Sequence, residues 1–168
     1  SLAFEPEKIE TAIFAGGCFW GVESFFQKVP GVLSAVSGYV GGNTSDPTYE
    51  QVCTGRTGPA DAVRVIFEPA TVSYEAFAKM FFEIHDPTQL NRQGPDIGSQ
   101  YRSAVFPLDH EQKNTAERLI NRLRSTGLEV VTSVEEPSAF HPAEDYHQNY
   151  LNKTGRPQCH IRVPRFEN

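Results

Sequence analysis

The chain has 168 residues, a length that fits one domain with a substantial core. Its 15 Lys and Arg residues against 21 Asp and Glu residues give a net charge of −6, without a basic run, so we do not expect nucleic-acid binding. No stretch approaches the roughly 18 apolar residues that would span a membrane. The first residues lack the basic and apolar regions of a signal peptide, and we expect a cytoplasmic protein without membrane contact.

The first part of the chain alternates apolar runs with a helical pattern. The run Thr11–Ala15, closed by two glycines, predicts a buried strand, and Phe19–Val29 predicts a helix that ends before Pro-Gly. Val32–Val40 predicts a second strand. Asn43–Gly58 is rich in Gly, Thr, Ser, Asp and Pro and predicts a long loop. Apolar residues at period two then predict a strand over Asp61–Glu68.

The middle of the chain contains a second helix and a second polar loop. Ser73 is a good N-cap for a helix that presents Tyr74, Phe77, Ala78 and Phe81 on one face and ends before Pro87. Asp86–Gln100 predicts a loop that contains glycine and proline, and Tyr101–Phe106 predicts a strand.

The last elements complete the predicted order β-α-β-β-α-β-α-β. Asp109 caps a helix whose apolar residues recur at helical spacing, and Gly127 stands where a C′ glycine is expected. Leu128–Val134 predicts a strand, and one short helix is expected near 143–151. We therefore predict an α/β fold, a two-layer α+β sandwich with a ferredoxin-like split βαβ core. We expect one domain over residues 1–168, with a core at about 11–135 and a coil-rich tail at about 136–168.

The segment Gly16-Gly17-Cys18-Phe19-Trp20-Gly21 places a cysteine between a strand and a helix. Unpaired N–H groups and the helix dipole at such a position favour the thiolate and lower the pKa of a thiol. Three cysteines are too few for a disulfide scaffold, and an odd number leaves at least one thiol outside any intramolecular pair. The pattern therefore indicates thiol chemistry at Cys18. A small buried cysteine in a tight turn is the alternative.

Six motifs give this chain a resemblance to a known family. GGCFWG, SGYVGG, PTYEQVCTG, HDPTQ, GPDIGSQYRSA and FHPAEDYHQNYL occur in this order between about Thr11 and Cys159. The chain thus resembles the A-type peptide methionine sulfoxide reductases. The resemblance implies a monomeric enzyme, without cofactor or metal, that reduces methionine S-sulfoxide in oxidised proteins and as the free amino acid.

The resemblance also implies roles for individual residues. Cys18 attacks the sulfoxide sulfur, and Tyr49 and Tyr101 donate hydrogen bonds to the oxygen. Asp61 stands at the position of the family's acid. Phe19 and Trp20 form the recess for the substrate methyl group, and Asp96 orders this region. Without the resemblance, both tyrosines read as core residues and Asp61 as an ordinary carboxylate at a strand end.

Asp61 is a departure from the family pattern. The family has a Gly-His-Ala-Glu segment where this chain has Gly58-Pro59-Ala60-Asp61. Asp is one methylene shorter than Glu, which moves the carboxyl group back by about 1.5 Å. To act as an acid, Asp61 must be held protonated, which requires an apolar or otherwise pKa-raising environment.

Recycling is implied by the same resemblance. Oxygen transfer leaves a sulfenic acid on Cys18. Cys159, in Gly-Arg-Pro-Gln-Cys, matches the family's resolving cysteine, and thioredoxin or a similar dithiol protein would reduce the disulfide. An idle exposed thiol is the alternative for Cys159. We interpret Cys53 as a packing residue.

Three rival hypotheses remain open from the residues alone. His141, Glu144, Asp145 and His147 could form a metal site, although their spacing fits no closed zinc site and a solvated polar helix is the simpler interpretation. A cysteine hydrolase would need His147 within hydrogen-bonding reach of Cys18. A peptide-binding module would use the aromatic residues without any chemistry at Cys18.

Overall fold

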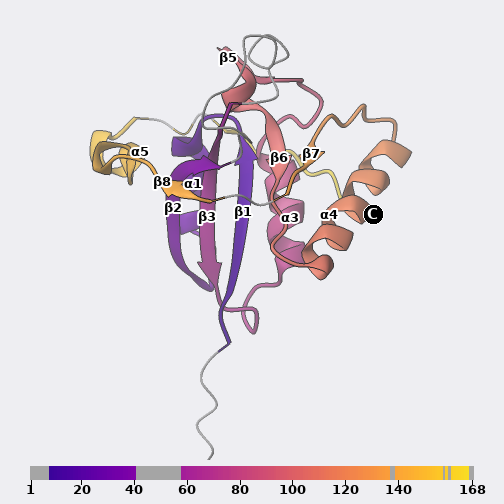
Figure 1. Ribbon diagram of the computed structural model, residues 1–168, viewed down its shortest axis with the longest axis horizontal. Helices are drawn as coiled ribbons and strands as arrows, with labels where there is room; N and C mark the ends of the chain where they lie inside the picture. Colours follow the sequence, from indigo (N-terminus) through magenta and orange to yellow (C-terminus); the bar gives the residue numbers. More distant parts are fainter. Residues whose placement is uncertain (1–7, 41–57, 137–138, 157, 159, 167–168) are drawn as a thin grey trace, which may run out of the picture.

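The computed structural model describes residues 8–40, 58–136, 139–156, 158 and 160–166. Its main sheet has six strands in the order β7-β6-β1-β3-β2-β8 (Figure 1). The strands are β1 Glu10–Gly16, β2 Val32–Val40, β3 Ala60–Phe67, β6 Ser103–Val105, β7 Ser133–Val134 and β8 His141–Pro142.

The four central strands have the ferredoxin-like arrangement. β3 lies between β1 and β2 and is antiparallel to both, while β1 lies between β3 and β6 and is antiparallel to both. The predicted split βαβ core is therefore confirmed. The two edge strands extend this core: β7 runs parallel to β6, and β8 runs antiparallel to β2.

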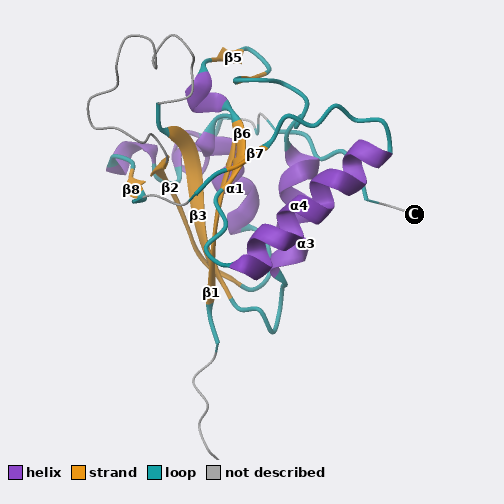
Figure 2. Ribbon diagram, turned by 45° about the vertical axis from the view of Figure 1, so that its right-hand side comes forward, coloured by secondary structure: helices purple, strands orange, loops and turns teal. Residues whose placement is uncertain are grey.

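Three longer helices complete the second layer: α1 Phe19–Gln27, α3 Tyr74–Ile84 and α4 His110–Ser125. α1 and α3 pack on the sheet, and α4 packs against α3 (Figure 2). The predicted caps are present, because the side chains of Ser73 and Asp109 accept hydrogen bonds from the amides of Ala76 and Gln112. Gly127, just after α4, has φ +101°, as expected for a C′ glycine.

Successive side chains along a strand point to opposite faces of the sheet, so the buried core has two parts. Ala12 and Phe14 of β1 are buried with the apolar faces of the helices, whereas Ile13 and Ala15 are buried in a smaller cluster with Phe106. This is the period-two pattern of a strand buried on both faces. The phenylalanines of the larger cluster stack on one another; the rings of Phe14 and Phe81, for example, have centroids 4.9 Å apart.

Two strand predictions were wrong in extent. Tyr101 lies in a 3₁₀ turn, η1 Ser99–Tyr101, and not in the strand, which begins at Ser103. Of the segment predicted as a strand over 128–134, only Ser133 and Val134 pair with β6. In both cases the sequence pattern does not distinguish residues of a paired strand from those of an adjoining turn or unpaired segment.

The remaining elements are short. The predicted loop at 86–100 contains a small hairpin, β4 Arg92–Gln93 and β5 Asp96–Ile97. The tail has a 3₁₀ turn, η2 Asp145–His147, and the helix α5 Tyr150–Thr154, in place of one helix over 143–151. The predicted loop at 43–58 lies almost entirely outside the described residues.

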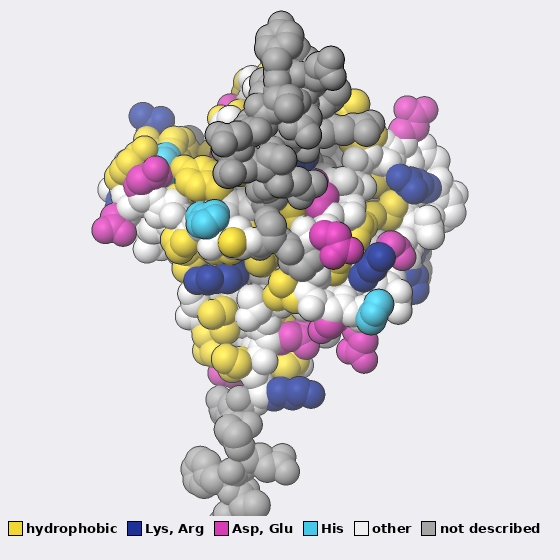
Figure 3. Space-filling model, in the orientation of Figure 1, with side chains coloured by type: hydrophobic (Ala, Val, Ile, Leu, Met, Phe, Trp, Pro, Cys, Tyr) yellow, Lys and Arg dark blue, Asp and Glu magenta, His cyan; other side chains and the backbone are white. Residues whose placement is uncertain are grey.

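The surface agrees with the modest net charge. On the face in Figure 3, acidic and basic side chains are interspersed and do not gather into a basic band. Among the helices in the described ranges, none has the length and apolar character needed to cross a membrane.

Candidate active site

The strand-to-helix turn places Cys18 as the sequence predicts. β1 ends at Gly16, Gly17 has φ +91°, and Cys18 is the N-cap residue of α1 with an extended backbone. Glycine adopts such a positive φ without strain, so the chain can turn sharply into the helix. The thiol therefore lies at the positive end of the α1 dipole, which favours the thiolate.

A cavity of about 620 Å³ opens in front of Cys18. Its lining includes all the site residues that the sequence predicts within the described ranges. These are Cys18, Phe19, Trp20, Asp61, Asp96 and Tyr101. Tyr49, Cys53 and Cys159 lie outside the described residues. The cavity therefore joins a nucleophile, a carboxyl group, a phenol and two aromatic walls.

Asp61 lies where burial favours the protonated form of its carboxyl group. It lies near the start of β3, opposite Tyr39 of β2, and its side chain is buried. Burial, and then the nearby charge of Asp96, raise the pKa of Asp61 to about 7. A substantial fraction of Asp61 is therefore protonated at neutral pH, in contrast to an ordinary aspartate.

The raised pKa makes stability depend on pH. Asp61 binds a proton more tightly in the folded chain than in the unfolded one, so its contribution is most favourable below about pH 4 and is lost as pH rises to about 7. Asp61→Asn carries no charge at this position. We therefore expect its free energy of unfolding to rise relative to that of the wild type over this pH interval, by on the order of 2–4 kcal/mol. Urea unfolding of both proteins between pH 4 and pH 8 measures the difference. A gap that stays constant with pH would contradict the burial of an ionisable Asp61.

Tyr101 reaches the cavity from the η1 turn. Arg102 ties this turn to the segment that precedes β3, since its Nη1 donates to the carbonyl oxygens of Ser99 and Gly58, both at 3.0 Å. Burial raises the pKa of Tyr101, and the nearby negative charges of Asp61, Asp96 and Cys18 raise it further. The phenol thus stays protonated and can donate a hydrogen bond close to both Cys18 and Asp61.

The tail supplies one wall of the cavity by holding the indole of Trp20. Trp20 Nε1 donates to Nδ1 of His147 at 3.0 Å, and the indole stacks on Tyr150 with ring centroids 3.7 Å apart. His147 Nε2 lies 3.5 Å from Oε2 of Glu144, which also accepts a hydrogen bond from the Tyr39 hydroxyl at 3.2 Å. Burial and then this hydrogen bond raise the pKa of Tyr39 to about 12.

This network bears on two of the rival hypotheses. Both ring nitrogens of His147 are directed at Trp20 and Glu144, an arrangement that does not suit a general base for Cys18. Within the described part of the chain, no group of three or more His, Cys, Asp or Glu side chains is arranged to hold a metal ion.

The segment on either side of position 159 is anchored next to Cys18. Gln158 Nε2 donates to the Gly21 carbonyl oxygen at 3.0 Å, and His160 Nε2 lies 3.3 Å from the carbonyl oxygen of Cys18. His160 Nδ1 donates to the carbonyl oxygen of Ile84 at 2.7 Å. A Cβ atom at Gly21 would overlap the His160 ring. The last glycine of GCFWG is therefore needed for this close approach.

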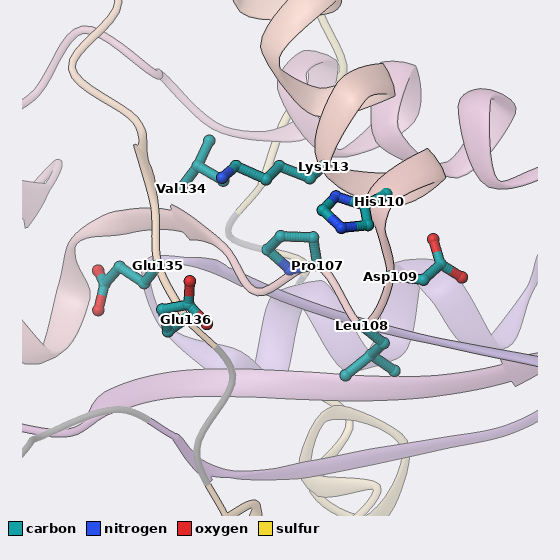
Figure 4. Close-up of a pocket in the computed structure, with 8 residues that line it drawn as sticks. All are labelled: Pro107, Leu108, Asp109, His110, Lys113, Val134, Glu135 and Glu136. Atoms are coloured by element: carbon teal, nitrogen blue, oxygen red, sulfur yellow. The ribbon is translucent and has the colours of Figure 1, made fainter.

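A second cavity, of about 350 Å³, lies at the start of α4 and shares no lining residue with the first (Figure 4). Its Glu135 is already paired with Arg102 through two hydrogen bonds of 2.8 Å. Burial alone would raise the pKa of Glu135, but the hydrogen bonds from Arg102 and Ser133 outweigh it and lower the pKa. We therefore assign this carboxylate to the ion pair.

Sequence reasoning missed Tyr39, Tyr150 and the contact of His147 with Trp20. Tyr39 stands in SGYVGG and the other two in FHPAEDYHQNYL, so the motifs contain the signal. The contact between Trp20 and His147 spans 127 residues of chain, and local patterns carry no information about it.

Comparisons with known proteins identify the family of this chain. Residues 10–168 match the family model described as peptide methionine sulfoxide reductase. The chain is 51% identical to the peptide methionine sulfoxide reductase MsrA of Nautilia profundicola, over 93% of this chain and 91% of that one. It is 52% identical to the MsrA of Deinococcus radiodurans, over 89% and 75% of the two chains.

Solved structures show the same similarity. The reduced form of Mxr1 from Saccharomyces cerevisiae has a TM-score of 0.78 at 30% identity and covers 96% of each chain. Methionine sulfoxide reductase A of Corynebacterium diphtheriae has a TM-score of 0.72 at 34% identity, over 95% of this chain and 81% of that one.

Proposed function

Since the chain belongs to the peptide methionine sulfoxide reductase family, it is an oxidoreductase that returns methionine sulfoxide to methionine, and we propose how its own residues do so. The observation that carries the proposal is one cavity that holds Cys18 at a helix N-terminus, a buried Asp61 with a raised pKa, and an aromatic wall. Nucleophile, acid and substrate recess are the parts that sulfoxide reduction needs.

In the proposed reaction, the Cys18 thiolate attacks the electrophilic sulfur of the sulfoxide. Asp61 gives a proton to the sulfoxide oxygen, which is a poor leaving group while unprotonated. The oxygen passes to the cysteine sulfur as a sulfenic acid, and methionine leaves with its sulfur reduced. Tyr101 donates a hydrogen bond to the oxygen as charge develops on it, and we propose the same role for Tyr49.

The walls of the cavity favour one epimer. We propose that the substrate methyl group lies against Phe19 and Trp20 while the oxygen faces Asp61 and Tyr101. A sulfur held by both contacts has one handedness, and the family resemblance indicates the S epimer. Asp96, on the same cavity, helps order the polar side.

The test of this function is single turnover on resolved epimers. We expect the reduced enzyme, without added reductant, to form about one methionine per molecule from a peptide that contains the S-sulfoxide, and far less from the R-sulfoxide. Mass spectrometry and amino-acid analysis quantify both products. Equal rates on the two epimers would overturn the proposed orientation of the substrate.

Recycling requires a second thiol, and we propose Cys159. Its thiol would condense with the Cys18 sulfenic acid, releasing water and forming a disulfide. The anchoring of Gln158 and His160 beside Gly21 and Cys18 supports this pairing. Thioredoxin or a similar dithiol protein would reduce the disulfide and is itself oxidised. Such reductants keep thiols reduced in the cytoplasm, which we propose as the compartment.

We expect Cys159→Ser to separate reduction from recycling. The variant should still form about one methionine per enzyme without reductant, because Cys18 is intact. With thioredoxin as the reductant, the variant should complete no further turnovers, and a small-molecule thiol should restore part of the turnover. Peptide mapping of the oxidised wild type provides the check: a Cys18–Cys53 disulfide in place of Cys18–Cys159 would overturn the recycling scheme and leave Cys18 as the nucleophile.

A further inference from the structure

Glu23 is a buried carboxylate that the reaction does not use. It lies on α1, five residues after Cys18, with a side chain exposed by only 1%. Its Oε2 accepts hydrogen bonds from the amide of Ser37 at 3.1 Å and from the Ser37 hydroxyl at 2.8 Å. Its Oε1 accepts one from the amide of Asn149 at 2.6 Å. A buried carboxylate is costly unless it is well hydrogen-bonded, and these three donors meet that need.

These hydrogen bonds connect the helix, the sheet and the tail at one point. Ser37 belongs to β2, and Asn149 immediately precedes α5. Asn149 has φ +56°, a conformation that is uncommon for a residue other than glycine. A strong, short hydrogen bond to its amide helps hold the chain in that turn.

The turn at Asn149 determines where two aromatic partners of Trp20 lie. His147 and Tyr150 stand two residues before and one residue after Asn149, and both contact the indole of Trp20. Since Trp20 and Glu23 are both on α1, the carboxylate fixes the tail relative to the helix that carries the indole.

We propose that Glu23 is a positioning residue for the substrate recess. It holds the turn at Asn149, so that His147 and Tyr150 fix the Trp20 indole in the wall that receives the substrate methyl group. This inference rests on the proposed role of Trp20. It differs from a direct electrostatic effect of Glu23 on Cys18.

The variant that tests the proposal is Glu23→Gln, which keeps the shape of the side chain and replaces one acceptor oxygen by an NH₂ donor. If the remaining oxygen turns to Ser37, the new NH₂ group faces the Asn149 amide, donor against donor. If it stays on the Asn149 amide, the NH₂ group faces Ser37, whose hydroxyl can accept and whose amide also donates to Gln148 Oε1 at 3.0 Å. Ser37→Ala is the matched control, because it removes the hydroxyl donor and leaves the Asn149 amide bound to Glu23.

The readout is direct because Trp20 is the only tryptophan of the chain. For Glu23→Gln we expect red-shifted emission and stronger acrylamide quenching of Trp20, and about a tenfold rise in KM for an S-sulfoxide peptide. The single-turnover rate at saturating substrate should keep the wild-type pH profile. Ser37→Ala should leave Trp20 emission and KM close to wild type.

Other outcomes overturn the proposal. Unchanged Trp20 emission and quenching in both Glu23→Gln and Glu23→Asp would overturn it, and so would a shifted pH profile with unchanged KM, which indicates an electrostatic effect on Cys18. Should Glu23→Gln fail to fold by circular dichroism, Glu23→Asp, whose shorter side chain cannot reach both Ser37 and Asn149, must show the same changes. If the wild type reduced no sulfoxide, the proposed function would fail, while the fluorescence comparison would still test the link from Glu23 to Trp20.

Discussion

Replacement of Cys18 by serine is expected to abolish sulfoxide reduction. A serine hydroxyl stays protonated at neutral pH and is a far weaker nucleophile than a thiolate, even at a helix N-terminus. Cys18 is the N-cap of α1 and lines the cavity, so serine fits the same space and the fold should persist. Single-turnover assays with an S-sulfoxide peptide, together with circular dichroism, measure both effects.

Two companion measurements make the Cys18→Ser result informative. Cys53→Ser should keep reductase activity, because we assign Cys53 to packing. Binding of a sulfoxide peptide to Cys18→Ser should survive, because the aromatic wall and polar donors remain. If the chain acts as an enzyme through Cys18, the Cys18→Ser variant therefore loses turnover but still binds the peptide. Near wild-type turnover in Cys18→Ser, with loss in Cys53→Ser, would show that we have assigned the wrong nucleophile.

Asp61 is expected to have the second largest effect. Asp61→Asn removes the proton donor and should lower the single-turnover rate by about 10²- to 10⁴-fold, as for other general acids. Asp61→Glu should raise the rate, because the longer side chain brings the carboxyl group about 1.5 Å closer to the substrate oxygen. For the wild type, the rate should fall as pH rises through about 7, where Asp61 loses its proton.

Rapid-quench measurement of methionine release by the two variants and the wild type gives these rates without the recycling steps. Tyr101 and solvent are the alternative proton sources. If Asp61→Asn and Asp61→Glu both keep wild-type rates, the proton comes from one of these, and the buried carboxyl group serves structure alone.

Much of the framework follows from local rules. The glycines before Cys18, the caps Ser73 and Asp109, and the buried strand β1 are each determined by neighbouring residues, and each was predicted from the sequence. The position of Cys18 at a helix N-terminus belongs to this class. The role of Asp61 required more: its raised pKa depends on burial at the start of β3 and on the charge of Asp96, 35 positions away.

Other features depend on contacts between distant segments. Tyr101 was predicted as the first residue of a strand over 101–106, whereas it lies in a 3₁₀ turn that Arg102 holds through the carbonyl oxygens of Gly58 and Ser99. The tail reads as polar and coil-rich, but the tertiary contacts of His147 and Tyr150 make it a wall of the cavity. Periodicity in the sequence carries no information about such pairings.

The short edge strands of the sheet affect how this protein can interact with partly unfolded polypeptides. Oxidised polypeptides are often partly unfolded, and an exposed strand edge would offer them a template for aggregation. Here β7 and β8 are two residues long, and β8 includes Pro142. On the outer side of β2, the side-chain amide of Gln148 accepts a hydrogen bond from the Ser37 amide and donates one to the Ser37 carbonyl oxygen. Nearer its start, β2 has a register shift between Val32 and Ser34. We expect edges of this kind to disfavour strand addition by damaged chains.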